Sequence, residues 1–366
     1  MNTKIMFHGS YLKEDVSFLV KVIDMKFTQI DEKERLIQSG MSHYSQMLSP
    51  EYEPSLAYLE IFYQAYADNK KRFASDILTL AYHLSQKKNI VLVSLLRAGT
   101  PIGVLLKRTL RDVFDTQVNH YSISIIRDRE IDELALKYIL KENPESEFIF
   151  IDGWTGKGVI NRELKVFIKK FNEENKTNIS DKLYVISDIA SVSDFAVNND
   201  DYLIPSSALN STISGLVSRS ILNDEHIKEG DFHGCKYYAE YAKSDLSLWF
   251  IDEITTLIKG LTIDTKPLVS RDSILRSKMR DFLLTLQKEW QISDINHIKP
   301  GIGESTRVLL RRVPYVILVQ NLASQEIGHL LLLAKEKEVE VIEDKALPYK
   351  ALAIIKNMTK DSVEKN

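Results

Sequence analysis

Continuous apolar runs alternate with longer helical patterns through the middle of the chain. Residues 90–96 and 148–151 are runs of Ile, Val, Leu and Phe interrupted only by Ser94, a composition typical of buried strands. Each run is followed by a turn that contains glycine, and then by apolar residues at helical spacing over 102–114 and 161–171. Strands that alternate with helices favour a parallel sheet with helices on both faces. The pattern therefore predicts an α/β fold with a doubly wound parallel sheet.

Two further runs extend the predicted sheet. Residues 120–126 alternate between apolar and polar side chains, and residues 182–188 form another buried strand that ends in Asp188. The chain from residue 202 begins as a strand and becomes a loop rich in hydroxyl and amide side chains. We expect a helix over residues 213–221 to follow that loop.

Long helical patterns lie before and after this sheet. Residues 54–85 carry apolar side chains at helical spacing, with an expected break near residues 68–69. Residues 237–258 form a second amphipathic pattern. We therefore expect residues 1–88 to be a mainly helical region that packs on the core, and residues 89–261 to be the central domain.

The last hundred residues have a different organisation. Lys266 and Pro267 lie in a stretch that we interpret as a linker, so a third unit is expected over 262–366. In this unit helical patterns alternate with apolar runs at 315–320 and 339–342, which favours a small α/β/α sandwich. From Thr265 onward there are 17 Lys and Arg against 13 Asp and Glu, a net charge of +4, while the rest carries −7. This polarity favours nucleic-acid contact by the tail.

Composition sets broad limits on the class of protein. The 366 residues are 44% hydrophobic and 27% charged, which is ordinary for a globular protein, and the net charge of −3 gives no general nucleic-acid signal. One cysteine excludes an internal disulfide framework and is compatible with a reducing compartment. No apolar run approaches the length of about 18 residues that a membrane span needs, and the first residues lack the apolar core of a signal peptide. We expect a cytoplasmic protein.

The turn after the second apolar run carries the clearest chemical signal. Asp152 is followed by three glycines, Thr155 and Lys157, and then by a helix. Backbone amides in a glycine-rich turn at a helix start bind phosphate well. The spacing matches neither a P-loop nor a dinucleotide fingerprint, because Val159 follows Gly158 and Asn161 stands where a third glycine is needed. A strand–turn–helix without a ligand is the alternative interpretation.

A companion turn, Arg97-Ala98-Gly99-Thr100, follows the first apolar run. The two turns together resemble the pyrophosphate loop and the diphosphoribose-binding motif of type I phosphoribosyltransferases. The resemblance implies a phosphoribosyltransferase-like domain in which Asp152 holds ribose hydroxyls and residues 155–158 bind the 5′-phosphate of phosphoribosyl pyrophosphate. It also implies Mg²⁺ bound through that substrate, with no direct protein ligand. The chain departs from the family at two positions. Gly153 stands where the family has a second acidic residue, and Lys157 stands between two glycines of the loop.

The same resemblance implies further site residues. Arg127 and Arg129 lie in a charged segment that corresponds to the mobile hood of the family, and a solvated charge cluster is the alternative. Together with Asp152 and Arg97 they form the predicted catalytic set. The predicted substrate-binding residues are Ser94, Ala98, Gly99, Thr100, Gly153, Trp154, Thr155, Gly156, Lys157, Gly158, Asp188, Asn210 and Ser211. For Asn210 and Ser211, capping of the following helix is an equally open role.

A short motif in the last unit resembles the Pelota-type RNA-binding domain. Gly303 and Glu304 precede Arg307 at the start of an expected helix, and Arg311 follows one turn later. The resemblance implies phosphate contacts from the arginines and a base contact from Glu304. A protein-interaction or structural domain is the alternative.

The whole arrangement resembles the predicted phosphoribosyltransferases of tellurite-resistance and stress gene clusters, also catalogued as the StiP family and there described as cysteine proteases. Three functions therefore compete. The first is a transferase that moves ribose 5-phosphate to an unknown acceptor. The second is a non-catalytic nucleotide sensor that binds RNA. The third is a cysteine protease that uses Cys235, with His233 two residues away. For Cys235, a small buried residue before the amphipathic pattern of residues 237–258 is the alternative interpretation. We expect the transferase.

Overall fold

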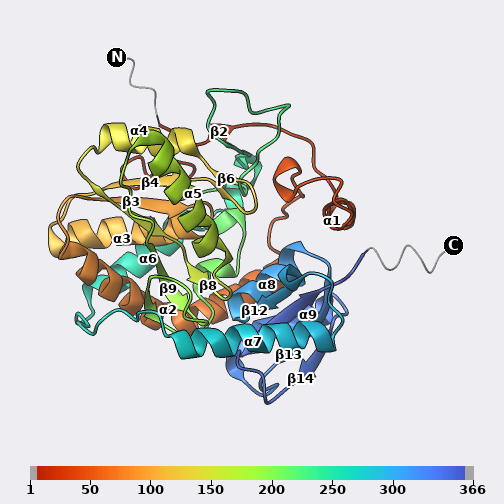
Figure 1. Ribbon diagram of the computed structural model, residues 1–366. Coiled ribbons are helices and arrows are strands. Elements are labelled where there is room, and N and C mark those ends of the chain that lie inside the picture. Colours follow the sequence, from red (N-terminus) through yellow and green to blue (C-terminus); the bar gives the residue numbers. More distant parts are fainter. Residues whose placement is uncertain (1–5, 359–366) are drawn as a thin grey trace.

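A seven-stranded sheet forms the centre of the molecule (Figure 1), and all of its strand pairs are parallel. The computed structural model describes residues 6–358. The strands are β1 (Ser17–Phe18), β3 (Ile90–Leu95), β4 (Asn119–Ile123), β7 (Glu147–Ile151), β8 (Trp154–Thr155), β9 (Leu183–Asp188) and β10 (Phe195–Asn198). Their order is β1-β4-β3-β7-β9-β10, and β8 pairs with β9. The predicted α/β architecture with a parallel sheet is confirmed.

Helices cover both faces of this sheet. α2 (Leu56–Ser85), α3 (Gly99–Phe114) and α6 (Ser247–Lys259) pack on one face, and α4 (Glu133–Glu142) and α5 (Val159–Asn175) on the other (Figure 1). The strand side chains alternate accordingly, because Leu92 joins the first hydrophobic cluster while Val91 and Val93 join the second. Within residues 6–358, no helix combines the length and apolarity that a membrane-spanning helix requires.

The N-terminal segment is more varied than the sequence predicts. β1 extends the central sheet beyond β4, and β2 (Lys21–Val22) pairs in parallel with β11 (Gly234–Cys235) away from that sheet. A short helix, α1 (Ile30–Gln38), follows. The break expected at residues 68–69 is wrong, because α2 runs on unbroken and Asn69 donates to the carbonyl of Ala65 inside the helix.

Three other element predictions are wrong in the segment from 202 to 258. Residues from 202 do not form a strand, and the helix predicted at 213–221 is absent. Gly215 and Leu216 have φ angles of +83° and +57°, which a right-handed helix does not allow. The chain then runs extended beside β11, with bridges from Val217 to Tyr237 and from Ile221 to Gly234. The helix predicted from residue 237 begins only at α6, after the 3₁₀ turn η4 (Ala239–Ser244). We call residues 217–221 the flanking segment.

The C-terminal unit is a second, smaller three-layer arrangement. Its sheet has the order β12-β15-β13-β14, from β12 (Ile298–Pro300), β13 (Pro314–Val319), β14 (Glu340–Glu343) and β15 (Ala351–Ile355). Its helices are α7 (Ser273–Glu289), α8 (Ile302–Arg311) and α9 (Gly328–Glu336). Ile317 and Val319 pack with α8 and α9, whereas Val316 and Leu318 pack with α7. The cluster that contains Ile317 also contains α2 and α3, so the unit shares a core with the central domain.

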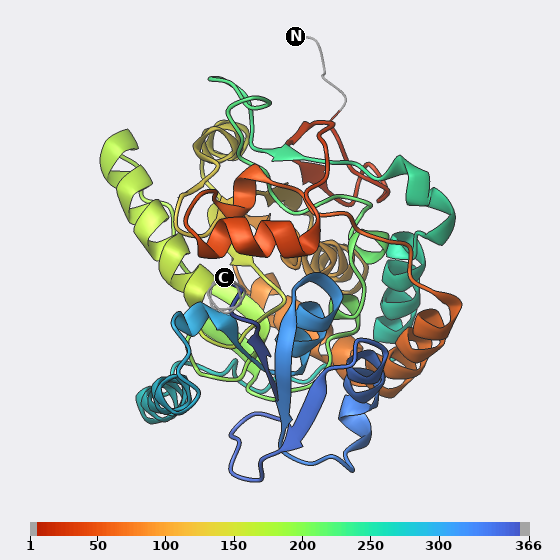
Figure 2. The same ribbon diagram turned by 90° about the vertical axis from the view of Figure 1, so that its right-hand side faces the viewer.

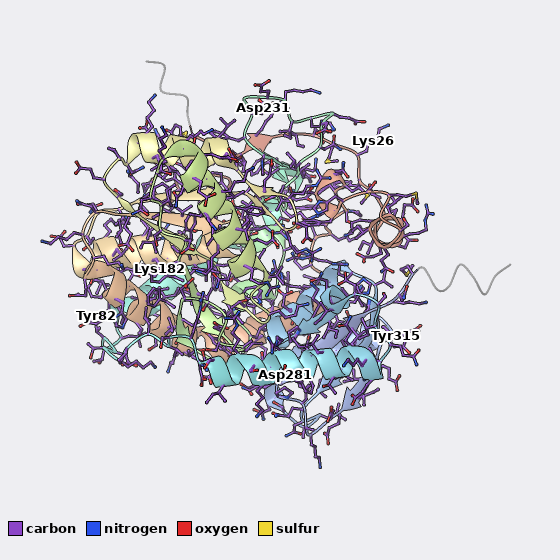
Figure 3. The ribbon with its side chains drawn as sticks, viewed as in Figure 1. Lys26, Tyr82, Lys182, Asp231, Asp281 and Tyr315 are labelled. Carbon is purple, nitrogen blue, oxygen red and sulfur yellow. The ribbon has the colours of Figure 1, made fainter. Side chains whose placement is uncertain are left out.

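Seen from the side, α1, in red, lies directly above the blue C-terminal unit (Figure 2). Three contacts join them: Arg312 pairs with the buried Glu34 at 2.5 Å, Gln38 donates to the carbonyl of Lys356 at 3.0 Å, and the amide of Met358 donates to Gln38 Oε1 at 2.7 Å. The C-terminal unit is thus held by the N-terminal segment as well as by the central domain. Its outer surface, marked by Asp281 and Tyr315 in Figure 3, points away from both.

Candidate functional site

Two turns meet at the carboxyl edge of the central sheet. β3 and β7 are neighbours, and the chain leaves them in opposite directions, towards β4 and towards β9. This divergence opens a crevice at the strand ends, where ligands of open α/β sheets collect. Arg97 follows β3 and Asp152 follows β7. The two turns touch, because a Cβ on Gly99 would lie 2.3 Å from the carbonyl oxygen of Ile151.

The turn after β7 satisfies many of its own polar groups. Asp152 Oδ1 accepts from the backbone amide of Gly153 at 2.8 Å, and burial raises the pKa of Asp152 to about 6. Thr155 Oγ1 accepts from the amide of Gly158 at 3.0 Å. Gly158 has a φ of +68°, so glycine is the residue that opens α5 at low cost. The turn is therefore preformed.

The C-terminal unit covers part of this turn. Lys157 donates from Nζ to the carbonyls of Ile295 and Ile298, at 2.9 and 2.8 Å. Burial lowers the pKa of Lys157 well below its usual value. A Cβ on Gly156 would lie 2.9 Å from the carbonyl oxygen of Pro300. Lys157 lies in the predicted phosphate-binding loop, but its amino group is hydrogen-bonded to the C-terminal unit and helps to hold the two units together.

Arg97, the cationic residue of the first turn, is buried. Its side chain is 4% exposed, and Nη1 donates to Glu51 at 2.8 Å and to the carbonyl of Val217 at 2.9 Å. Burial opposes the ionisation of Glu51, but Arg97 and then Arg311 outweigh it and lower the pKa of that carboxyl. Nη2 of Arg97 has no hydrogen-bond partner among residues 6–358.

Helix α8 brings the predicted RNA-binding residues to the same place. A Cβ on Gly303 would lie 3.2 Å from the indole of Trp154, and the Arg307 guanidinium lies 5.0 Å from the centre of a Trp154 ring. Arg307 also pairs with Glu304 at 3.4 Å. Arg311 donates from Nε to Asn210 Oδ1. The predicted phosphate turns and the predicted RNA-binding face therefore form opposite walls of one space.

We call this space the interdomain cavity. It comprises a hollow of about 440 Å³, a second of about 300 Å³ and a narrow one of about 10 Å³, which share lining residues such as Arg307. Its walls carry ten cationic and five anionic side chains, although the whole chain has a net charge of −3. The cations are Lys33, Arg97, Arg127, Lys157, Arg219, Lys299, Arg307, Arg311, Arg312 and Lys337, and the anions are Glu51, Glu53, Asp152, Glu304 and Glu336.

The pKa values of the cavity cations are lowered mainly by burial and secondly by neighbouring cations. Burial, followed by Arg219 and Arg312, lowers the pKa of Lys33 to about 7. Burial is also the main reason why the pKa of Lys299 falls to about 8, with Arg312 among the cations that add to it and Glu304 opposing. Burial lowers the pKa of Arg219 to about 10. Burial disfavours the charged ammonium group, and the neighbouring anions offset only part of that effect.

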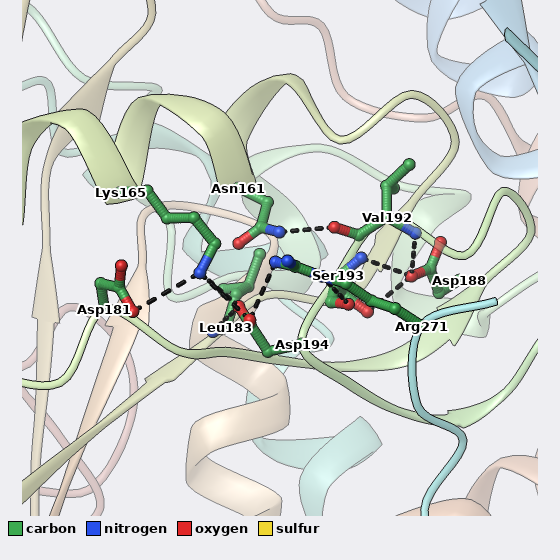
Figure 4. A network of polar contacts seen from close by, with 9 residues as sticks. All are labelled: Asn161, Lys165, Asp181, Leu183, Asp188, Val192, Ser193, Asp194 and Arg271. Atoms are coloured by element: carbon green, nitrogen blue, oxygen red, sulfur yellow. Dashed lines mark hydrogen bonds and ion pairs between the residues drawn. The ribbon is translucent and has the colours of Figure 1, made fainter. Parts of the chain in front are cut away.

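Several predicted substrate-binding residues lie elsewhere. Ser94 Oγ is 2.7 Å from His120 Nε2, and Thr100 Oγ1 is 2.7 Å from Ser122 Oγ, in both cases inside the core. Asp188 accepts from the amides of Val192 and Ser193 and from the Ser193 hydroxyl, so it fixes the loop after β9. Figure 4 shows this loop, whose network extends through Asp194 to Arg271 and Lys165. None of these three predicted side chains lines the cavity.

The other predicted residues lie at the cavity, in buried turns beside it, or on the surface. Arg127 lines the 300 Å³ hollow, where it pairs with Asp128 at 2.7 Å and lies over the ring of Tyr44. Arg129 is exposed and does not line the cavity. Ala98 and Gly153 approach each other at the crevice. The amide of Ser211 donates to Glu51, on the outer side of the Arg97 pair.

Several cavity residues are not among the site residues that the sequence predicts. Glu51, Lys33 and Arg219 come from loops and a short helix with no recognisable motif, so no local signal identifies them. Lys299 lies four residues before Gly303, so its position beside the Pelota-like motif is a sequence signal that could identify it. Within residues 6–358, no three His, Cys, Asp or Glu side chains converge as metal ligands do, and the predicted Mg²⁺, which depended on a diphosphate substrate, stays untested.

Cys235 lies outside this cavity. Its side chain is fully buried in β11, and burial alone raises the pKa of its thiol to about 12. His233 Nδ1 is 2.8 Å from Ser124 Oγ, and its Nε2 is 3.1 Å from Glu130 Oε1. Both ring nitrogens of His233 are therefore engaged with groups other than the thiol. Asp132 accepts from the backbone amide of His233 at 2.6 Å.

Comparison with known proteins gives two family matches and one full-length relative. Residues 9–255 match the family described as "Tellurite-like stress resistance cysteine protease StiP", and residues 277–357 match the "PELOTA RNA binding domain". The "Cysteine protease StiP" of Acinetobacter baylyi is 39% identical over 372 residues, which span 97% of this chain and 95% of that protein.

These findings correct the function expected from the turns. The prediction of a phosphoribosyltransferase is wrong, because both the family that covers most of the chain and the full-length relative are named as cysteine proteases. Phosphoribosyl pyrophosphate loses its support as a partner together with that activity. The resemblances to the StiP family and to the Pelota domain are confirmed. On the family match over residues 9–255 and the identity across nearly the whole chain, this protein belongs to the StiP family.

Proposed function

We propose that the protein is a cysteine peptidase whose nucleophile is Cys235. The observation that carries this proposal is the cysteine count: a member of a family named for a thiol protease has a single cysteine in its whole sequence. Any thiol chemistry must therefore pass through Cys235. The peptidase name of the Acinetobacter baylyi relative supports the same reaction class.

The reaction requires an ionised thiol and a proton carrier. Sγ of Cys235 adds to the carbonyl carbon of a peptide bond, the amine leaves with a proton, and water hydrolyses the thioester to a carboxylic acid and the free thiol. His233 is the proposed proton carrier, because residues two apart in an extended chain project to the same side. Its partner Glu130 is 53% exposed, so the contact at Nε2 can open at little cost in solvation.

The closed conformation holds this nucleophile in a latent state. With a pKa near 12 the thiol is protonated at neutral pH. β11 pairs with β2 over only two residue pairs, and single bridges join it to the flanking segment. Short ladders of this kind open locally at much less cost than the central sheet. We propose that such an opening exposes Cys235 and permits catalysis.

The test measures peptide hydrolysis and thiol reactivity together. Unfolded casein and a mixture of synthetic peptides serve as substrates for the full chain, for Cys235→Ala and for Cys235→Ser. Hydrolysis should fall at least about 100-fold in both variants, with thermal unfolding midpoints close to that of the parent. Alkylation by iodoacetamide is read by mass, and the single cysteine makes the assignment unambiguous. Hydrolysis that survives unchanged in Cys235→Ala would remove the proposal.

RNA binding by the C-terminal unit is a second candidate function, supported by the match to the Pelota domain and by the arginines of α8. Arg307 and Arg311 line the interdomain cavity, so single-stranded RNA that enters there is the proposed ligand. Fluorescence polarisation with a short single-stranded RNA should show affinity that falls with salt. Arg307→Ala should weaken it and lower the salt slope by about one. Arg280→Ala, on the outer face of α7, is the matched control, and equal effects of both variants would exclude this mode of binding.

A further inference from the structure

Four buried polar atoms without partners belong to residues that line the narrow hollow of the interdomain cavity. They are Arg97 Nη2, Trp154 Nε1, Ser206 Oγ and Ser207 Oγ, and none has a hydrogen-bond partner within the described part of the chain. Arg97 and Ser207 are only 6% and 2% exposed. Guanidinium and indole N–H groups can only donate, and serine hydroxyls can donate as well. Buried donors normally have acceptors, so this group of atoms indicates a ligand that supplies acceptor oxygens.

Charge points to an anion at the same place. Arg307 and Arg311 line the narrow hollow beside Arg97, so three guanidinium groups surround it, whereas no Asp or Glu is among its lining residues. Two carboxylates that line the adjoining 440 Å³ hollow are engaged, since Glu51 pairs with Arg97 and Glu304 pairs with Arg307. Guanidinium groups favour phosphate because their parallel N–H donors match its oxygens.

Size indicates what the anion is attached to. The narrow hollow, at about 10 Å³, accepts about one oxygen atom. The adjoining hollows of about 300 and 440 Å³ have the volume of small-molecule sites. The smaller one is bordered by Trp154 and Tyr44, which offer ring surfaces for a planar group. A phosphate oxygen in the centre and an organic group beside it make a ligand of nucleotide size.

We propose that the interdomain cavity is a binding site for a nucleotide phosphomonoester, with Arg97, Arg311 and Ser207 facing the phosphate. The chemistry is the same whether the phosphate belongs to a free nucleotide or to the 5′ end of a single-stranded RNA. The site is independent of Cys235, so it stands even if the peptidase proposal fails. It differs from general RNA binding because it needs the terminal phosphate.

Calorimetry on the full chain tests this site with four probes: inorganic phosphate, adenosine 5′-monophosphate, and a six-nucleotide single-stranded RNA with and without a 5′-phosphate. Binding of adenosine monophosphate supports the free-nucleotide source. Binding of the phosphorylated RNA alone supports the RNA-end source. Equal binding of both RNAs with no competition by phosphate, or no binding of any probe at millimolar concentration, overturns the proposal.

Variants locate the bound probe. Arg311→Gln should weaken it at least tenfold, and Ser207→Ala should weaken it by a smaller factor. Arg280→Gln, an exposed arginine on α7, should leave the affinity unchanged. Because Arg97 is also a structural ion pair, Trp154→Phe provides a second readout that keeps the fold. It removes one donor, and it should weaken binding and abolish most of the ligand-induced change in tryptophan fluorescence. Affinity unaltered in Arg311→Gln, Ser207→Ala and Trp154→Phe would overturn the assignment.

Discussion

The interdomain cavity and the surroundings of Cys235 are both buried, but they treat ionisable groups in opposite ways. Around Cys235 burial acts alone, and it keeps the thiol neutral. In the cavity burial also disfavours charge, yet cations accumulate there and carboxylates such as Glu51 stay ionised beside them. No neighbouring charge offsets the effect of burial on the Cys235 thiol, whereas the cavity holds positive charge in excess.

Position in the fold explains part of this difference. The cavity lies where β3 and β7 diverge, at the edge of a sheet that presents strand ends and turns to a ligand. Cys235 lies on β11, a two-residue strand outside that sheet. The family name directs attention to the thiol, while geometry and charge direct it to the cavity. A reaction at the buried thiol therefore requires β11 to move.

Removing Arg97 should have the largest effect on this contrast. Arg97→Met leaves Glu51 buried without its cation, which should lower the free energy of unfolding by about 3–5 kcal/mol. The double variant Arg97→Met with Glu51→Leu should recover much of that loss, because it leaves no uncompensated charge. Urea denaturation gives both values, with Arg280→Met as the exposed control. A single variant that loses less than about 1 kcal/mol would mean that the pair is not enclosed as described.

Replacing Lys33 should change the free energy of unfolding in the opposite direction to replacing Arg97. Its pKa of about 7 lies below the usual 10.4 of an unfolded lysine, so the unfolded state binds more protons between those values. Stability contributed by this site therefore rises with pH from about 7 to about 10 and carries its full penalty below 7. Lys33→Met should raise the free energy of unfolding by up to about 4 kcal/mol at pH 6.5, since each pH unit between the two pKa values corresponds to about 1.4 kcal/mol, and the difference should vanish towards pH 10.

The control for that measurement is Lys26→Met, an exposed lysine labelled in Figure 3, which should leave the pH profile unchanged. The charged groups that act on Lys33 are Arg219, Arg312, Glu34 and Arg311, and the pKa of Arg219, lowered by burial to about 10, lies at the upper end of this window. A Lys33→Met difference that does not depend on pH would show that lost packing, not charge, decides the result. The cavity would then resemble the Cys235 region more than we describe.

The sequence predicts the strands and turns at the cavity better than the cavity itself. Apolar runs identify β3, β7 and β9, and parallel pairing places Arg97 and Asp152 at one edge. Glu51 lies 46 residues from its partner Arg97, and no local pattern links the two. Helix α8 covers the turns only because the C-terminal unit shares a core with α2, a tertiary fact without a sequence signal.

The wrong predictions have equally specific causes. The helix expected at 213–221 is prevented by Gly215 and Leu216 in the left-handed region and by pairing with β11, which outweigh its apolar spacing. The transferase prediction depends on two turns. Such turns indicate where a ligand binds, but they do not specify which reaction follows. Lys157 illustrates the limit, because its amino group is used on backbone carbonyls of the C-terminal unit.

The smallest expected effect tests whether the two regions are independent. The flanking segment carries Arg219 in the cavity wall and pairs with β11 on the side opposite β2. An opening that exposes Cys235 through this segment should separate Arg219 from the cavity. A ligand that binds only the intact cavity then reduces the open population by a factor of 1 + [L]/Kd.

At ten times Kd of adenosine monophosphate, alkylation of Cys235 by iodoacetamide should slow about tenfold, or about 1.4 kcal/mol. The Arg311→Gln variant, with weakened binding, should show a much smaller change at the same concentration. An alkylation rate that saturating ligand does not alter, in a protein shown by calorimetry to bind it, would mean that β11 opens on the β2 side alone. Slower alkylation in the parent chain would instead show that the bound phosphate ligand stabilises the conformation in which Cys235 is buried. The flanking segment would then couple the cavity to the surroundings of Cys235.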